Sequence, residues 1–108
     1  MVIEEIRNAF NNIPVEYSKH CLQRMLERDI LRADINNCIL FGEIIEDYPL
    51  DENNDSTKSL PSCLILGRKK DDDKSIHIVL GYNGKKILII SACYPDPAIW
   101  EDDYRTRR

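Results

Sequence analysis

Apolar residues recur every three or four positions in three stretches near the start of the chain, and this period predicts three helices. The stretches cover residues 2–11, Ser18–Arg28 and residues 32–41. Ser18 is a suitable N-cap for the second helix, since its hydroxyl can accept a hydrogen bond from a backbone N–H of the first turn. Gly42 stands where the third helix should end. The N-terminal part of the chain is therefore predicted to be helical.

From residue 43 onward the pattern changes to runs of β-branched and aromatic residues, which are typical of strands. Polar or charged segments separate four such runs, at residues 43–48, 61–67, 75–82 and 85–94. The polar residues 49–60 are predicted to form a loop. The seven consecutive charged residues 68–74 are predicted to form a solvated turn, and Asn83-Gly84 a hairpin.

The end of the chain is predicted to form a short helix and a tail. Asp96 and Pro97 suit the N-cap and first position of a helix that runs through Trp100. Residues 105–108 are expected to be a frayed basic tail. The elements together predict a single α+β domain over residues 1–108, with the N-terminal helices packed on one face of a four-stranded, mainly antiparallel sheet.

Composition narrows the class of protein without changing this picture. The chain has 108 residues, 43% of them hydrophobic, and a net charge of −4, which fits one globular domain. No apolar run approaches the roughly 20 residues needed to span a bilayer, and the first residues are acidic where a signal peptide is basic. We therefore expect a cytoplasmic protein without a membrane partner. The net negative charge argues against strong non-specific binding of nucleic acid, but it leaves room for a local basic patch.

The four cysteines are widely spaced, and each lies inside an apolar segment: Cys21, Cys38, Cys63 and Cys93. In a reducing compartment such residues are expected to be buried free thiols. A zinc site is the alternative, although the close ligand pairs that structural zinc sites use are missing. We predict no metal and no cofactor.

The second predicted helix carries a stripe of candidate functional residues. His20, Arg24 and Arg28 are four positions apart, so they lie one above the other on a helix. An imidazole that titrates near neutral pH beside two guanidinium groups suits an anionic substrate. The alternative is a solvated helix face, because the stripe is nearly opposite the apolar arc of the same helix.

Short motifs follow one another along residues 17–104. They are Ser-x-His-x-x-x-Arg-Met-x-x-Arg from Ser18 to Arg28, Gly-Glu-x-Ile-x-x-Tyr from Gly42 to Tyr48, Pro-Ser-x-Leu from Pro61 to Leu64, the strand residue His77, and a final Tyr94, Pro97 and Trp100. In this order they resemble a bacterial family of domains of unknown function, numbered four-two-five-eight. The chain departs from that family at Leu31, where the family has a helix-capping serine.

The resemblance implies a function. That family is similar to the RelE/ParE-like and MqsR-like toxins of toxin–antitoxin pairs, many of which cleave mRNA without a metal. Its genes often lie beside a zinc-finger antitoxin. The resemblance therefore implies a RelE-like fold and a metal-independent endoribonuclease, with RNA and an antitoxin-like protein as partners.

RNA cleavage by attack of a 2′-hydroxyl needs a general base, a general acid and cations near the phosphate. We predict that His20 or His77 is the base or the acid, that Arg24 and Arg28 hold the phosphate, and that Tyr94 supplies a hydroxyl or a stacking face. The predicted substrate-binding residues are Arg28, Ser18 and Trp100. Each prediction has a structural alternative: a strand residue bonded locally for His77, a helix C-cap for Arg28, and core or edge aromatics for Tyr94 and Trp100.

Two other functions are compatible with the sequence. A non-catalytic interaction or regulatory module, bound by a small zinc-finger-like partner, is favoured by the net acidic charge and by the acidic segment 46–55. A metal-dependent hydrolase has little support, because Asp71-Asp72-Asp73 is typical of a solvated turn.

Overall fold

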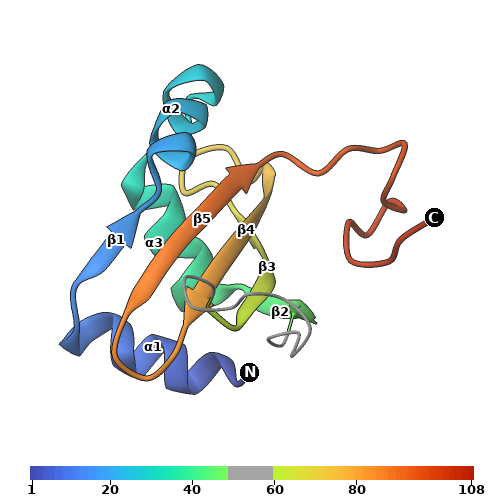
Figure 1. The fold of residues 1–108 in the computed structure, drawn as a ribbon. Coiled ribbons are helices and arrows are strands. Elements are labelled where there is room, and N and C mark those ends of the chain that lie inside the picture. Colours follow the sequence, from blue (N-terminus) through green and yellow to red (C-terminus); the bar gives the residue numbers. More distant parts are fainter. Residues whose placement is uncertain (49–59) are drawn as a thin grey trace.

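Three helices cover one face of a five-stranded sheet in the computed structural model, which describes residues 1–48 and 60–108 (Figure 1). The helices are α1 (Ile3–Asn12), α2 (Lys19–Arg28) and α3 (Arg32–Phe41). The strands are β1 (Val15–Tyr17), β2 (Glu43–Tyr48), β3 (Ser62–Arg68), β4 (Ser75–Tyr82) and β5 (Ile87–Cys93). The α+β class and the three helices agree with the sequence patterns, and element limits differ from the predicted ones by two residues at most.

The prediction of a four-stranded, mainly antiparallel sheet is wrong. The strand order is β1-β5-β4-β3-β2, and β1 pairs in parallel with β5, with Val15 opposite Ile87 and Tyr17 opposite Ile89. The other neighbouring strands are antiparallel. This mixed sheet also replaces the RelE-like sheet that the resemblance implied. The three residues of β1 are too few to show a strand alternation between Pro14 and the start of α2.

The predicted short C-terminal helix is also wrong. The backbone carbonyl of Asp96 accepts hydrogen bonds from the N–H groups of Ile99 and Trp100, so the capping residue forms a single turn as expected. The chain then reverses instead of continuing, and Trp100 forms an antiparallel bridge with Arg107. The reversal buries Trp100, which is only 5% exposed.

Residues 95–108 form a segment that we call the C-terminal clasp. The chain leaves the end of β5 and folds back on itself, with Glu101 N–H donating to the Thr106 carbonyl. Arg107 then bonds Glu46 on β2, through Nε at 2.7 Å and Nη2 at 2.9 Å. The expectation of a frayed tail at 105–108 is therefore wrong. The predicted loop 49–60 falls almost entirely on residues 49–59, which lie outside the described part of the chain.

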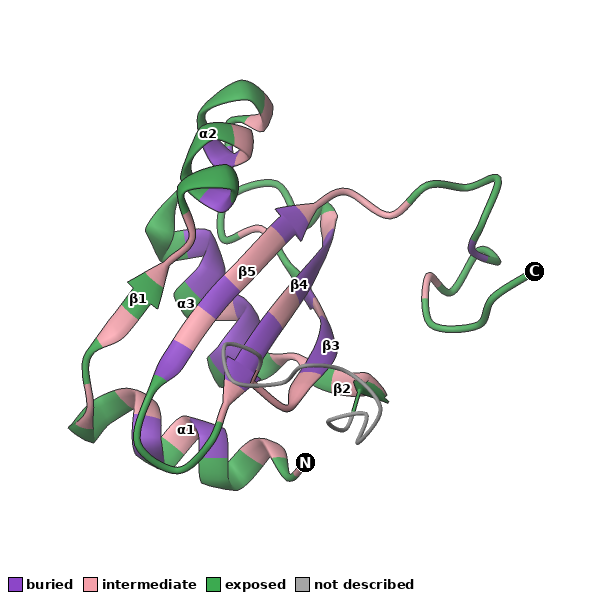
Figure 2. Cartoon of the chain, in the orientation of Figure 1, coloured by how far each residue is buried: buried purple, intermediate pink, exposed green. Residues whose placement is uncertain are grey.

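The core lies between the helices and the inner face of the sheet (Figure 2). Alternate residues of the central strands, such as Ile76 and Ile78 on β4, point into it, because side chains of a strand alternate between faces. Gly67 of β3 allows α3 to pack closely, since a Cβ atom there would lie 2.6 Å from Cys38. No helix within residues 1–48 and 60–108 is long and apolar enough to cross a membrane.

The cysteines are part of this packing. Cys21, Cys38 and Cys63 are fully buried, Cys93 is half-buried, and all four are free thiols. Burial raises the pKa of Cys38 to about 12 and that of Cys63 to about 11, so these thiols stay protonated at neutral pH. The prediction of buried free thiols is confirmed for the three fully buried residues.

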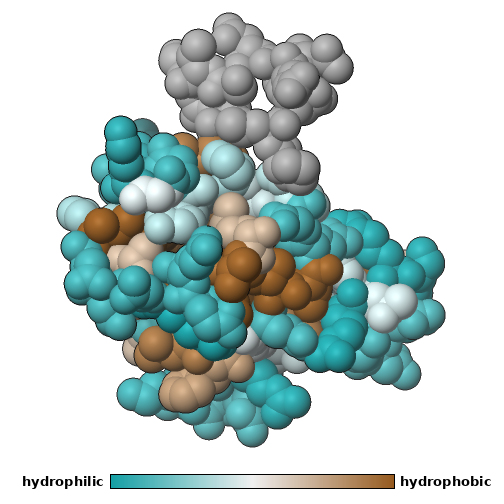
Figure 3. Space-filling view, turned by 90° about the horizontal axis from the view of Figure 1, so that it is seen from below, coloured by the Kyte–Doolittle hydropathy of each residue, from teal (hydrophilic) through white to brown (hydrophobic). Residues whose placement is uncertain are grey.

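Some large apolar side chains remain on the surface. Leu26 on α2 is 86% exposed and Phe41 at the end of α3 is 79% exposed. In the view from below, hydrophobic side chains also gather in the centre of the surface, bordered by hydrophilic ones (Figure 3). Apolar surface of this kind is typical of a protein that binds a partner.

Candidate functional site

The start of α2 is fixed to the middle of β5 by Ser18. The Ser18 hydroxyl accepts a hydrogen bond from the Cys21 N–H at 3.0 Å, which makes it the N-cap that the sequence predicts. The same hydroxyl donates to the Ile90 carbonyl at 2.9 Å. Both contacts are internal to the protein, so in this structure Ser18 positions the helix.

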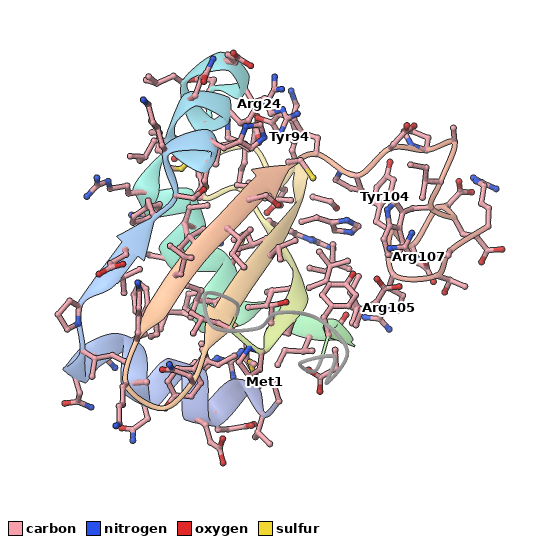
Figure 4. All side chains as sticks on the ribbon, viewed as in Figure 1. Met1, Arg24, Tyr94, Tyr104, Arg105 and Arg107 are labelled. Carbon is pink, nitrogen blue, oxygen red and sulfur yellow. The ribbon has the colours of Figure 1, made fainter. Side chains whose placement is uncertain are left out.

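The end of α2 is fixed to the end of β5 by two further bonds. The Arg28 guanidinium donates to the Ala92 carbonyl at 2.9 Å, and the Tyr94 hydroxyl donates to the Arg28 carbonyl at 2.7 Å. Arg24, one turn earlier on α2, lies with Tyr94 at the upper end of the sheet (Figure 4). The predicted stripe on α2 therefore leads directly to Tyr94.

Two lysines from the β3–β4 turn complete this site. Lys69 Nζ donates to the Asp29 carbonyl at 2.8 Å, next to the carbonyl that Tyr94 binds. Lys74 Nζ lies 5.8 Å from the centre of the Tyr94 ring, within the range of a cation–π contact. Desolvation lowers the pKa of Lys69, but the Tyr94 hydroxyl and the neighbouring carboxylates raise it more, so the net shift is upward.

We call the residues Arg24, Arg28, Lys69, Lys74 and Tyr94 the α2–β5 cluster. The hydrogen bonds that Arg28 and Lys69 donate go to neutral backbone carbonyls, which leave their positive charges uncompensated by a bonded carboxylate. Arg24 is different, because it pairs with Glu27 at 2.9 Å within the same helix.

The two lysines were not among the residues singled out in the sequence. Both belong to the charged run 68–74, which is a turn as predicted, and charged turns are usually only solvated. The sheet order gives Lys69 and Lys74 their position, because it places the turn between β3 and β4 beside the end of β5. The sequence signal that could have identified these two lysines is a basic residue near each end of the short turn that joins two antiparallel strands.

His20 and His77 lie in different environments. His20 is exposed on α2, one turn before Arg24, and makes no side-chain hydrogen bond within residues 1–48 and 60–108. His77 is 3% exposed and lies on the outer face of the sheet, since its neighbours Ile76 and Ile78 point toward the helices. The structure therefore joins Arg28 and Tyr94 at the ends of α2 and β5. His20 lies eight residues before Arg28 on α2, and His77 lies opposite Cys93 on the neighbouring strand, buried on the outer face of the sheet.

The C-terminal clasp covers His77. Its Nε2 lies 2.7 Å from the Tyr104 carbonyl and must donate to it, since a carbonyl can only accept. The Trp100 ring packs edge-on against the imidazole, with 4.6 Å between ring centres. Burial lowers the pKa of His77, with a smaller lowering from Arg107 and opposing effects of the Tyr104 bond and of Glu46. These contacts hold His77 neutral and surrounded by protein.

Arg107 and Glu46 hold the clasp against β2. The Arg107 guanidinium lies over the Trp100 ring at 4.6 Å from its centre, and it bonds both oxygens of Glu46. The bonds from Arg107 lower the pKa of Glu46 to about 2. Arg105 forms a second exposed pair, with Glu43. Trp100 is thus enclosed between a histidine and an arginine.

Residues 17–94 of the chain match a protein family described as Domain of unknown function (DUF4258). The chain belongs to this family. The match covers about seven-tenths of the chain and includes α2, the whole α2–β5 cluster and His77. No curated protein and no solved structure is significantly similar to the chain.

The DUF4258 match ends at Tyr94, so the C-terminal clasp lies beyond the matched region. The clasp nevertheless adds to the surface around the cluster. A groove of about 340 Å³ is lined by residues from the β3–β4 turn, the end of β5 and the clasp, namely Asp73, Lys74, Ser75, Tyr94, Pro95 and Tyr104. A larger cleft of about 560 Å³ lies on the far side of Asp73, between the end of α3 and the clasp.

The described residues of this DUF4258 domain hold no group of three or more His, Cys, Asp or Glu side chains placed to bind one metal ion. The polar groups around Tyr94 include the cations of the cluster and also Asp73, which lines the same groove. Cations of this kind bind anions such as phosphate.

Proposed function

We propose that this protein is a toxin of a toxin–antitoxin pair that cleaves RNA without a metal ion, and that the α2–β5 cluster is its RNA site. The observation that carries the proposal is the position of Tyr94: its hydroxyl bonds the Arg28 carbonyl, Lys69 bonds the adjacent Asp29 carbonyl, and Lys74 lies 5.8 Å from the centre of its ring. Cations of this kind bind a phosphodiester and stabilise the extra negative charge that develops on it during cleavage. The net charge of −4 does not oppose this, because the positive charge is local.

The reaction would proceed by attack of a ribose 2′-oxygen on the adjacent phosphorus. A base removes the 2′-hydroxyl proton, a 2′,3′-cyclic phosphate forms, and the 5′-oxygen leaves with a proton from an acid. Of the two histidines, the geometry favours His20, which is exposed on the cluster's own helix, over His77, which is buried under the clasp. Tyr94 is positioned to bond a phosphate oxygen or the leaving oxygen, exchanging its bond to the Arg28 carbonyl.

The test compares cluster variants with a matched surface variant in growth arrest and in cleavage of RNA by purified protein. Lys69→Ala, Arg28→Ala and Tyr94→Phe should each reduce both, while Lys85→Ala, an exposed lysine of the β4–β5 hairpin, should reduce neither. A substrate with 2′-deoxyribose at the cleaved nucleotide should stay intact, and a metal chelator should leave cleavage by the wild-type protein unchanged. Equal cleavage by the three variants and by the wild type would discard the site.

A second candidate is a non-catalytic module that binds a protein partner. The exposed apolar residues favour it, above all Leu26 and Phe41. Harmless expression together with tight binding to the product of a neighbouring gene would select this function. A toxin that also binds an antitoxin would instead cause growth arrest until the partner is expressed with it.

A further inference from the structure

We propose that the groove between Tyr94 and Tyr104 binds the base of a nucleotide next to the cleaved phosphate, and that Asp73 makes guanine the preferred base. This inference rests on the proposed function, because it takes the α2–β5 cluster as the phosphate site. It assigns a role to the C-terminal clasp, which the family match does not reach.

The groove has the size and the walls of a nucleobase site. Its volume of about 340 Å³ is at the lower end of the range for small-molecule sites, about 300–1,000 Å³. Two tyrosines from separate segments of the chain, Tyr94 and Tyr104, line the groove. Unpaired bases stack on aromatic rings whatever their sequence. Lys74 lines the groove and also contacts the Tyr94 ring, so the base groove is continuous with the cationic cluster.

The Tyr104 wall is fixed before any ligand binds. Tyr104 has φ of 55°, a left-handed conformation that a tyrosine adopts only when its surroundings hold it there. Its N–H donates to the Glu101 carbonyl at 2.8 Å, and its carbonyl accepts from His77 at 2.7 Å. Stacking on a wall that is already ordered loses little conformational entropy. His77 and Trp100 thus act as positioning residues for Tyr104.

Asp73 supplies the group that can read the base. Its carboxylate lines the groove, is exposed, and accepts no hydrogen bond from the residues that the structure describes. An ionised carboxylate only accepts hydrogen bonds and can take two at once. Guanine offers two adjacent N–H donors on its pairing edge, from N1 and N2, whereas adenine, cytosine and uracil place an acceptor beside their donor. Guanine is therefore the base that a carboxylate at this position distinguishes.

The experiment sequences the ends produced from a random-sequence RNA by wild-type protein and by variants. Guanine should be enriched at one position beside the cleaved bond, by about 5- to 150-fold, which is the range of a two-bond base contact. Asp73→Asn should lose this enrichment, while Asp71→Asn, a neighbouring exposed acid outside the groove, should keep it. Tyr104→Ala should lower kcat/KM for all sequences, and Tyr104→Phe should not, because the ring and the carbonyl remain.

Binding to DNA oligonucleotides, which lack the attacking 2′-hydroxyl, separates failure of the groove from failure of the proposed function. Wild-type protein should bind an oligonucleotide with one guanine more tightly than the same chain with adenine, and Asp73→Asn should bind both equally. This difference in affinity is expected even if no RNA is cleaved. In that case the proposed RNA cleavage is wrong, but the inference that the groove binds guanine is supported. Identical affinities and base frequencies for wild type, Asp73→Asn and Tyr104→Ala, with all three folded by circular dichroism, would overturn the inference.

Discussion

Two basic regions of this molecule are built from the same kinds of side chain and differ in the atoms that these side chains bind. In the α2–β5 cluster, Arg28 and Lys69 donate to backbone carbonyls beside Tyr94 and form no ion pair with a carboxylate among the described residues. In the C-terminal clasp, Arg105 and Arg107 pair with glutamates of β2. The cluster can therefore still bind an anion, whereas the arginines of the clasp are already paired with carboxylates.

The comparison shows that a basic side chain is available for binding or serves as a structural contact according to the group it bonds. Whether the side chain is an arginine or a lysine does not decide this. The two regions also have different neighbours. The guanidinium of Arg107 covers the buried ring of Trp100, so that pairing, stacking and burial act together. The cluster cations surround a hydroxyl at the edge of an open groove. The following predictions on stability test the structural half of this comparison.

Trp100→Ala should have the largest effect on stability. The substitution removes a ring that is only 5% exposed and takes away the packing over His77. We expect a loss of about 3 kcal/mol in the free energy of unfolding, measured by urea denaturation. Ile99→Ala, at the neighbouring and 47% exposed position, is the matched control and should change little. A loss below about 1 kcal/mol for Trp100→Ala would show that the clasp is not docked.

Glu46→Gln should have an intermediate effect. It keeps the shape of the side chain but removes the charge that both bonds from Arg107 require, which we expect to cost about 1 kcal/mol because the pair is partly exposed. The folded pKa of about 2 lies below the ordinary value of 4.5, so the wild-type stability from this group is present above pH 4.5 and is lost as the pH falls toward 2. That loss should be missing in the variant. An unchanged acid transition in Glu46→Gln would contradict the pairing.

His77 should give a smaller, pH-dependent effect. Its pKa is lowered in the folded protein, so the unfolded chain binds the proton more strongly. Stability from neutral His77 is therefore complete well above the ordinary pKa of 6.5 and falls as the pH drops below that value. His77→Gln should flatten the pH dependence of the melting temperature in this window. Equal curves for wild type and His77→Gln would contradict the account of the clasp.

Lys86→Gln should have the smallest effect. Lys86 pairs with Glu16 at 2.9 Å, but both side chains are about half exposed, and such pairs contribute roughly 0–1 kcal/mol. We expect less than about 0.5 kcal/mol in urea denaturation, and added salt should reduce this difference further because it screens exposed charges. If Lys86→Gln lost as much stability as Glu46→Gln, the contact of Arg107 with the buried Trp100 ring would not be what makes the Arg107–Glu46 pair stronger than an exposed pair.

The sequence predicts elements well where a cap and a repeating pattern agree. Ser18 caps α2 as expected, and of the apolar arc predicted to face the core, Cys21 and Met25 are buried. The prediction is wrong for Leu22 and Leu26 of the same arc, which are exposed. The pattern fails for β1, whose three residues cannot show a period, and for the clasp, whose shape depends on contacts far along the chain. The spacing of residues within one segment cannot predict the pairing of β1 with β5 or that of Arg107 with Glu46, because both join segments far apart in the sequence.

The candidate site was predictable in part for the same reason. Helix geometry alone aligns His20, Arg24 and Arg28, and β5 ends at Cys93, one residue before the limit that the strand pattern indicates. Lys69 could not be chosen from its neighbours, because only the sheet order places its turn beside Tyr94. His77 looked like a titratable group in a strand, and the residues that bury it lie more than 20 positions later.

The most direct test of the central claim is the rate of RNA cleavage by purified Lys69→Ala, compared with wild type and with the matched Lys85→Ala. Removing one cation that stabilises the developing charge should lower kcat by about 10²- to 10³-fold, with the melting temperature close to that of the wild type. Lys85→Ala should cleave at the wild-type rate. Equal rates for Lys69→Ala and Lys85→Ala would contradict the assignment of the α2–β5 cluster as the site that binds and cleaves RNA.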